Sequence, residues 1–216
     1  MSERARLVLV TPAPSEGAEW PGALADQLAA AARGGRIDAI IVRLPRLDDR
    51  TVIKLLKPIV PVAQEHGSAV LLEDAPALVA RSGADGVHLT GLEGLRDALE
   101  TLRPQERIVG VGGLRARHDA MEAAEAGVDY VMFGEPRRDG TAPPFPAVLE
   151  RAGWWAEVFE TPCVAHVESL EGVEPMAATG CEFVAVGDAV FNHPDGPEAG
   201  VREALAAIEA APVIER

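Results

Sequence analysis

Gly83-Ala84-Asp85-Gly86-Val87 is the first of three copies of one short phrase; the others are Gly127-Val128-Asp129-Tyr130-Val131 and Gly180-Cys181-Glu182-Phe183-Val184. Each copy consists of a glycine, one variable residue, an acid and the start of an apolar run. A glycine that follows a helical stretch suits the left-handed residue with which many helices end. The phrase therefore predicts a repeated turn that leads from a helix into the next parallel strand.

Short apolar runs, rich in β-branched residues, are spaced along the whole chain. They are apolar at nearly every position instead of alternating with polar residues, which is typical of strands buried on both faces of a parallel sheet. We therefore predict eight parallel strands, at residues 7–10, 37–42, 69–72, 86–89, 107–111, 130–133, 163–166 and 183–186.

Amphipathic stretches lie between these runs and have apolar residues at helical spacing. The phrase Thr90-Gly91-Leu92-Glu93 has the spacing of a capping box and predicts the start of a helix. The clearest helical stretches are residues 20–33, 50–66, 93–102, 114–126 and 198–210.

Strands that alternate with helices predict an α/β protein, and eight such units closing on themselves form a (β/α)8 TIM barrel. The competing fold is a doubly wound open sheet, which usually has a glycine-rich loop after its first strand. Thr11-Pro12-Ala13-Pro14 follows the first strand here, so we favour the barrel, as a single domain over residues 1–216. The irregular stretch 135–146 follows the sixth strand, at the face where barrels build their sites, and suggests a lid.

The composition limits the possible partners. Of 216 residues, 48% are apolar, which is enough for a sizeable core, and the net charge is −14. Such an acidic chain repels nucleic acid and anionic membranes, and no apolar run is long enough to span a bilayer. We expect a cytoplasmic protein with a small-molecule ligand. Trp154-Trp155 would mark a homodimer interface if exposed, but burial against the barrel is the expected state.

The fourth to sixth predicted strands contain Asp85-Gly86-Val87-His88-Leu89, Gly110-Val111 and Asp129-Tyr130-Val131-Met132-Phe133-Gly134. In order and spacing these segments resemble the thiamine-phosphate synthase family, together with its related thiazole tautomerases of the TenI type. Residues 7–11, 162–165 and 184–186 are similar to the family's first, seventh and eighth strands. The resemblance thus covers almost the whole chain.

The resemblance implies a transferase of thiamine biosynthesis. Enzymes of this family join hydroxymethylpyrimidine diphosphate to thiazole phosphate and release pyrophosphate with the help of Mg²⁺. Such a reaction needs cations around the diphosphate, carboxylates for the metal and backbone amides around the thiazole phosphate. All of these groups would lie at the C-terminal face of the barrel.

The diphosphate and metal motifs of the family are matched in part. Its Gln-Leu-Arg-x-Lys motif keeps Arg43 as a candidate diphosphate contact, whereas Pro45 stands at the lysine position. Arg43 has an alternative role as an ion-pair partner of Glu73 or Asp74. The family's Asn-Asp-Arg motif corresponds to Glu73 at the substrate and Asp74 at the metal, and Glu93 adds a second carboxylate for Mg²⁺. The alternative for Glu93 is a carboxylate at a helix N-terminus.

The phosphate-binding positions of the family differ more. Arg137 and Arg138 stand in its Thr-x-Thr-Lys loop, as candidate anion ligands or as solvated loop charges. The Gly-Gly pair after the seventh strand reads Val167-Glu168, so side chains are expected where a phosphate would approach. Gly187 and Asp188 follow the eighth strand, and Asp188 is expected to cap its own helix. Repulsion from these carboxylates predicts a degenerate site for thiazole phosphate.

Three histidines, His88, His166 and His193, are expected near the same rim, first of all as packed or hydrogen-bonded residues. His166 beside Glu168 is the candidate catalytic acid–base pair. Two functions stay open. One is a thiamine-phosphate synthase with a degenerate site, and the other is a divergent barrel that binds or transforms a different small molecule.

Overall fold

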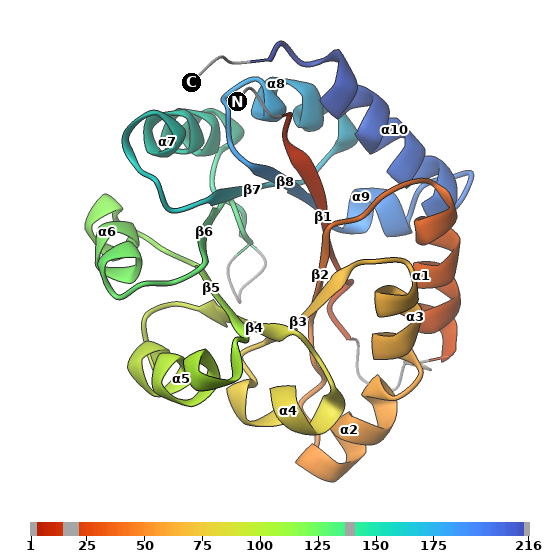
Figure 1. The fold of residues 1–216 in the computed structure, drawn as a ribbon. Helices are drawn as coiled ribbons and strands as arrows, with labels where there is room; N and C mark the ends of the chain where they lie inside the picture. The colour runs from red at the N-terminus through yellow and green to blue at the C-terminus, as the bar shows by residue number, and fades with distance from the viewer. Residues whose placement is uncertain (1–3, 15–21, 137–140, 214–216) are drawn as a thin grey trace.

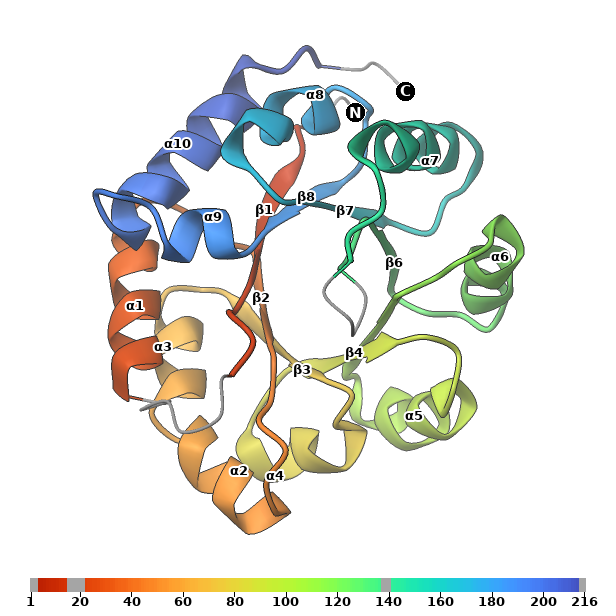
Figure 2. The ribbon, with the colours of Figure 1, turned by 180° about the vertical axis from the view of Figure 1, so that it is seen from behind.

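The computed structural model describes residues 4–14, 22–136 and 141–213, and these form a closed barrel of parallel strands (Figure 1). Strands that are consecutive in sequence are neighbours in the barrel, and β8 pairs with β1 to close the ring. Figure 2 shows the same ring from behind, with the helices outside it. The predicted (β/α)8 fold is therefore confirmed.

The strands begin and end within two residues of the predicted bounds, because the apolar and β-branched residues are concentrated in them. Register is fixed by backbone pairing, which places Leu7 beside Val184 where β1 meets β8. The bounds are β1 Arg6–Val10, β2 Ala39–Val42, β3 Ala69–Glu73, β4 Gly86–Thr90, β5 Ile108–Gly112, β6 Tyr130–Phe133, β7 Cys163–Val167 and β8 Phe183–Val186.

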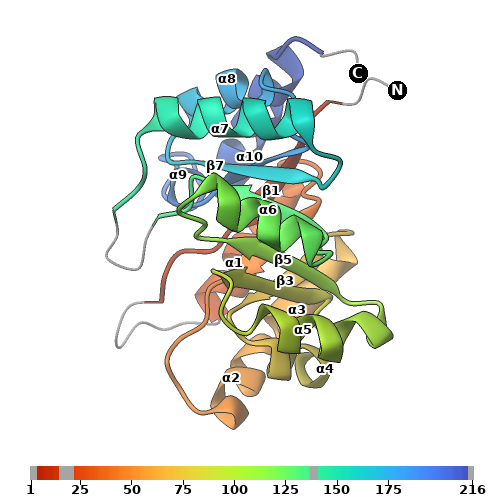
Figure 3. The same ribbon diagram turned by 90° about the vertical axis from the view of Figure 1, so that its left-hand side faces the viewer.

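Helices connect the strands and cover the outside of the barrel, as the side view in Figure 3 shows for α5, α6 and α7. None of those in the described part of the chain is long and apolar enough to cross a membrane. Their bounds are α1 Gly22–Arg33, α2 Asp49–Leu56, α3 Ile59–Glu65, α4 Val79–Ser82, α5 Leu95–Leu102, α6 Arg117–Glu125, α7 Phe145–Val158, α8 Val173–Ala177, α9 Asp188–Phe191 and α10 Pro197–Ala210. Short 3₁₀ turns lie at Pro76–Leu78, Arg103–Gln105 and Leu170–Gly172.

Two helix predictions are wrong in detail. The stretch 50–66 forms two helices, α2 and α3, because Pro58 has no N–H and its ring clashes with the preceding turn. The capping box is also absent at its predicted place, since α5 begins only after Gly94, which has a φ of 72°. Thr90 instead donates hydrogen bonds to Asp74 through both its backbone N–H and its hydroxyl.

The repeated phrase has a structural purpose that its sequence alone does not reveal. Its glycine has a left-handed φ of 80° to 89° in all three copies. Its acid accepts a hydrogen bond from a backbone N–H of the preceding strand, so each turn ties a new strand to its neighbour. The bonds run from Val70 to Asp85 (2.8 Å), from Val109 to Asp129 (2.7 Å) and from Cys163 to Glu182 (2.8 Å).

The apolar core has two parts. A larger cluster lies between the strands and the helices and includes Trp155, which is fully buried as predicted. The ring of Trp155 stacks on Phe159 with centroids 4.0 Å apart, whereas Trp154 is only partly buried. A smaller cluster fills the barrel itself, and its members are Val8, Val10, Ile41, Leu71, Tyr130, Met132, Val164 and Ala185.

Candidate functional site

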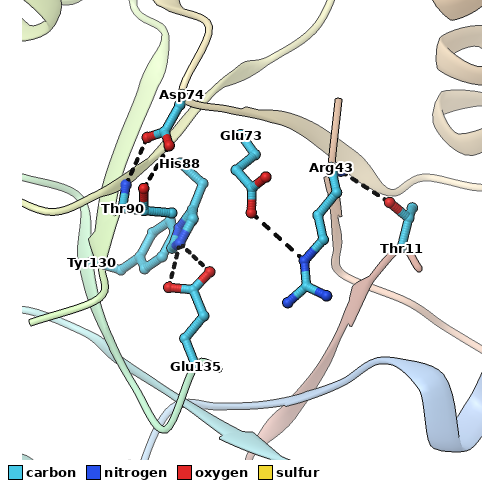
Figure 4. Close-up of polar contacts among 8 residues, drawn as sticks. All are labelled: Thr11, Arg43, Glu73, Asp74, His88, Thr90, Tyr130 and Glu135. Atoms are coloured by element: carbon cyan, nitrogen blue, oxygen red, sulfur yellow. Dashed lines mark hydrogen bonds and ion pairs between the residues drawn. The ribbon is translucent and has the colours of Figure 1, made fainter. Parts of the chain in front are cut away.

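Polar side chains from five parts of the barrel converge inside its C-terminal end. We call this set the mouth cluster: Arg43 after β2, Glu73 in β3, His88 in β4, Glu135 after β6 and His166 in β7. Figure 4 shows all of these except His166. Every second residue of a barrel strand faces inward. Arg43, Glu73 and His166 therefore each stand two positions after a residue whose side chain fills the barrel. Those residues are Ile41, Leu71 and Val164.

Arg43 is held in the mouth by Glu73. Its Nε lies 3.6 Å from Oε1 of Glu73, and its backbone N–H donates to the hydroxyl of Thr11 at 2.9 Å. The ion pair expected as one alternative for Arg43 is therefore present, and its role as a diphosphate contact stays a prediction. Burial, and next the charge of Glu135, raise the pKa of Glu73 above its ordinary value.

A buried chain of hydrogen bonds lies next to this ion pair. Nε2 of His88 donates to both carboxylate oxygens of Glu135 at 3.2 Å, and Nδ1 lies 2.7 Å from the hydroxyl of Tyr130. His88 is completely buried, which disfavours its charged form, but the charge and hydrogen bond of Glu135, together with the charges of Glu73 and Asp74, raise the pKa of His88. Burial likewise opposes ionisation of Glu135, but the charge and hydrogen bond of His88, together with the charge of Arg43, lower the pKa of Glu135. Burial raises the pKa of Tyr130 well above its ordinary value.

Two glycines of β5 make room for this chain of hydrogen bonds. A Cβ atom on Gly110 would lie 2.0 Å from the ring of Tyr130, and one on Gly112 would lie 2.3 Å from Oε2 of Glu135. Sequence reasoning missed Tyr130 and Glu135 as site residues. Tyr130 stands in the segment 129–134 that carries the resemblance but was given no role there, and Glu135 follows that segment. Glycine at alternate positions of an otherwise apolar strand was the available signal, since it marks a place where a bulky neighbour approaches the backbone.

His166 turns its ring into the mouth from β7. Its Nε2 lies 3.7 Å from the point that a Cβ atom on Gly187 would occupy. Its Nδ1 is buried without a hydrogen bond of standard geometry in the described residues, although the backbone of Gly134 is close enough to raise the pKa of the ring. Burial lowers the pKa of His166 to about 4, although the charge of Glu135 acts in the opposite direction. The imidazole is therefore neutral at pH 7. Glu168 is exposed beyond the end of β7, and its pairing with His166 stays a prediction.

The ends of β7 and β8 differ from the prediction in two respects. Val167 belongs to the larger apolar cluster between the strands and the helices and is 2% exposed, so only Glu168 of that pair presents its side chain to solvent. Asp188 is the first helical residue of α9 and not its N-cap, which is Gly187 and makes no side-chain capping bond. Asp188 stands one position too late in the chain to cap, because a capping side chain belongs to the residue before the first helical one. Its carboxylate is exposed.

A pocket of about 410 Å³ lies beside the ends of β6 and β7, and we call it the strand-seven pocket. Its described lining contains two carboxylates and no lysine or arginine. The lining residues are Gly134, Pro143, Phe145, Val148, His166, Val167, Glu168, Ser169, Glu171 and Gly172.

Asp74 and Glu93 lie on the loops after β3 and β4. Asp74 has a left-handed φ of 50° and accepts two hydrogen bonds from Thr90, whereas Glu93 is exposed. No group of three or more metal-ligating side chains is found in the described ranges. Mg²⁺ is commonly held by one or two carboxylates together with water and substrate phosphates. The pair therefore fits Mg²⁺ that is shared with a phosphorylated substrate, and does not fit Mg²⁺ held by protein alone.

The remaining predicted residues are Arg137, Arg138 and His193. Arg137 and Arg138 lie outside the described residues. Nε2 of His193 lies 3.2 Å from the carboxylate of Glu203 in α10, so this histidine has a structural partner elsewhere.

The fold and the mouth cluster define a (β/α)8 barrel with a candidate small-molecule site at the C-terminal ends of its strands. The sequence profile of the family described as thiamine monophosphate synthase matches residues 7–190. The chain therefore belongs to this family.

Relatives support the same assignment. The thiamine-phosphate synthase of Rhodospirillum centenum is 37% identical over 200 residues, covering 92% of this chain and 95% of the relative. The thiamine-phosphate synthase of Hyphomonas neptunium is 34% identical over 210 residues, covering 92% and 91%. The solved structure of thiamine phosphate pyrophosphorylase from Pyrococcus furiosus has a TM-score of 0.77 at 22% identity. The match covers 94% of this chain and 95% of the chain of that structure. The last similarity concerns the fold alone.

Proposed function

We propose that this protein is a transferase of the thiamine-phosphate synthase type. It joins hydroxymethylpyrimidine diphosphate to a thiazole at the barrel mouth and releases pyrophosphate. Relatives of that name cover 92% of the chain, which supports this reaction class. The observation that carries the proposal is the position of Arg43, which lies inside the mouth with Asp74 and Glu93 on the loops after the next two strands.

Each of these residues has a part in holding the diphosphate. Arg43 would donate to its oxygens, since guanidinium groups bind phosphates with two hydrogen bonds. Glu73 takes up a proton more readily than an ordinary glutamate, so an approaching diphosphate favours its neutral form and meets less repulsion. Asp74 and Glu93 would hold Mg²⁺, which when bound neutralises part of the charge on the leaving diphosphate.

Substitution of Arg43 tests this proposal. We expect Arg43→Met to lower thiazole-dependent pyrophosphate release by at least about 100-fold, since removing one donor from developing charge costs that much in other enzymes. Arg46→Met is the matched control, because Arg46 is exposed on the same loop, and its activity should equal that of the unchanged protein. No thiazole-dependent release by the unchanged, folded protein would contradict the proposal.

The second candidate function is a divergent barrel that binds or transforms a different small molecule. The observation that favours it is the charge of the mouth cluster, where two carboxylates, Glu73 and Glu135, stand against one arginine that is already paired. Such a mouth disfavours two phosphorylated substrates at once. Binding of a thiazole without any pyrophosphate release would support this candidate over the transferase.

A further inference from the structure

Glu73 is the carboxylate of the mouth cluster that a ligand can reach. It projects inward from the end of β3, and Figure 4 shows it between Arg43 on one side and His88 with Glu135 on the other. Its side chain is 25% exposed, whereas that of Glu135 is 3% exposed. A molecule that enters the barrel mouth therefore has more access to the carboxylate of Glu73 than to that of Glu135.

The carboxylate of Glu73 accepts no hydrogen bond from the described part of the chain. Nε of Arg43 lies 3.6 Å from its Oε1, which is an ion pair but too long for a hydrogen bond. Glu135, in contrast, accepts from Nε2 of His88 through both of its oxygens. A largely buried carboxylate without a donor is costly, so Glu73 favours a ligand that brings an N–H group to it.

The pyrimidine of the proposed donor substrate carries such a group beside its diphosphate. Its amino group and the methylene that bears the diphosphate stand on neighbouring ring carbons. We propose that Glu73 accepts a hydrogen bond from this amino group while Arg43 donates to the diphosphate. Glu73 is then the residue that selects an aminopyrimidine. The inference rests on the proposed function and assigns this residue to one part of the substrate.

The arrangement of the two side chains matches that of the two substrate groups. Substituents on neighbouring ring carbons lie in contact with each other, and the Arg43 and Glu73 groups that would bind them are 3.6 Å apart. A guanidinium group donates to phosphate oxygens, and a carboxyl oxygen accepts from an amino group. The reverse orientation would bring the diphosphate against Glu73 and Glu135, two carboxylates that repel it.

The same hydrogen bond assists the reaction. When the C–O bond to the diphosphate breaks, pyrophosphate takes the electron pair and positive charge develops on the methylene carbon. The amino group is conjugated with this carbon through the ring, so its nitrogen takes up part of the charge and its N–H becomes a stronger donor. The ring nitrogen of the thiazole then attacks the methylene carbon and forms the C–N bond. Glu73 therefore stabilises the transition state more than the bound substrate.

Isothermal titration with Mg²⁺ present and thiazole absent tests the inference without relying on turnover. The ligands are the pyrimidine diphosphate and an analogue in which hydrogen replaces the amino group. We expect the unchanged protein to bind the first at least about tenfold more tightly, because the analogue leaves Glu73 without a donor. In Glu73→Met this preference should fall below about threefold, whereas Glu73→Gln, which keeps an oxygen acceptor, should retain a preference of at least about fivefold.

Arg43→Met is the matched control, because it removes the diphosphate contact and leaves Glu73 in place. It should weaken the binding of both ligands alike and keep the preference of the unchanged protein. Pyrophosphate release with thiazole phosphate present gives a second readout. We expect kcat for the aminopyrimidine to fall at least about tenfold in Glu73→Met, with a smaller loss in Glu73→Gln.

Three results would overturn the inference. They are equal binding of the two ligands by the unchanged protein, an undiminished preference in Glu73→Met, and a preference lost as fully in Glu73→Gln as in Glu73→Met. Each of these results leaves the proposed reaction in place. Failure of the folded, unchanged protein to bind either diphosphate would overturn the proposed function itself, so the two failures are distinguishable.

Discussion

At the scale of single residues, the charge of Glu135 changes the pKa of several groups in the mouth cluster. Its carboxylate accepts from His88 and repels Glu73, so it raises the pKa of both. Because the pKa of His88 is raised on folding, the stability that this pair contributes is fully present below the unfolded pKa of about 6.5 and is lost as the pH rises through the folded value.

Replacement of Glu135 by glutamine keeps the size of the side chain and removes its charge. We expect Glu135→Gln to lower the free energy of unfolding by about 1–3 kcal/mol at pH 6, with a smaller loss at pH 9. Urea denaturation at the two pH values measures both quantities. Equal losses at pH 6 and pH 9 would show that the charge on His88 plays no part.

His166 has the opposite dependence on pH. Burial lowers its pKa to about 4, so the unfolded chain binds its proton more tightly than the folded protein does. Stability is therefore lost as the pH falls from about 6.5 towards 4. We expect His166→Asn to flatten the change in urea midpoint between pH 7 and pH 5. An unchanged pH profile in this variant would contradict a neutral, buried His166.

At the scale of the elements, Gly110 and Gly112 of β5 leave the space that the side chains of His88, Tyr130 and Glu135 fill. We expect Gly110→Ala to destabilise the protein by about 1–3 kcal/mol or more, because the added methyl group would overlap the ring of Tyr130. Gly153→Ala in α7 is the matched control, since its Cβ atom would meet only Thr179 at 3.8 Å. That change should stabilise the helix by about 0.5–1 kcal/mol. Thermal unfolding of both variants decides, and equal effects would refute the steric argument.

The acid of the repeated phrase belongs to the same scale. We expect Asp129→Ala to cost about 1–3 kcal/mol, because the buried N–H of Val109 would lose its partner. Glu100→Ala, on an exposed face of α5, should change stability by less than about 0.5 kcal/mol. If chemical denaturation gives the same small effect for both variants, the acid does not tie the strands together.

The strands and the barrel could be predicted because their signals are local. Continuous apolar runs and repeated turns are visible in the sequence itself. The break between α2 and α3 was predictable as well, because a proline at position 58 interrupts a continuous helix. Site residues could be predicted only where a charged residue stands at the end of a strand, as Arg43 and Glu73 do. The contact of Tyr130 and Glu135 with His88 depends on which inner side chains meet across the barrel, and that depends on strand register and not on local pattern.

For the whole molecule, the barrel brings one paired arginine, a buried histidine–carboxylate chain and an acidic pocket to the same end. The arginine and the metal-binding candidates Asp74 and Glu93 suit a diphosphate donor. The central claim is therefore that this mouth joins the two heterocycles, with Arg43 at the diphosphate of the donor.

Mass spectrometry of the product tests this claim most directly. The purified protein and its Arg43→Met variant would each receive the pyrimidine diphosphate, Mg²⁺ and thiazole phosphate. We predict that the unchanged protein forms thiamine phosphate and that the variant forms at least about 100-fold less of it. Absence of the product from the unchanged, folded protein would contradict the transferase, and equal amounts from both proteins would contradict the role of Arg43.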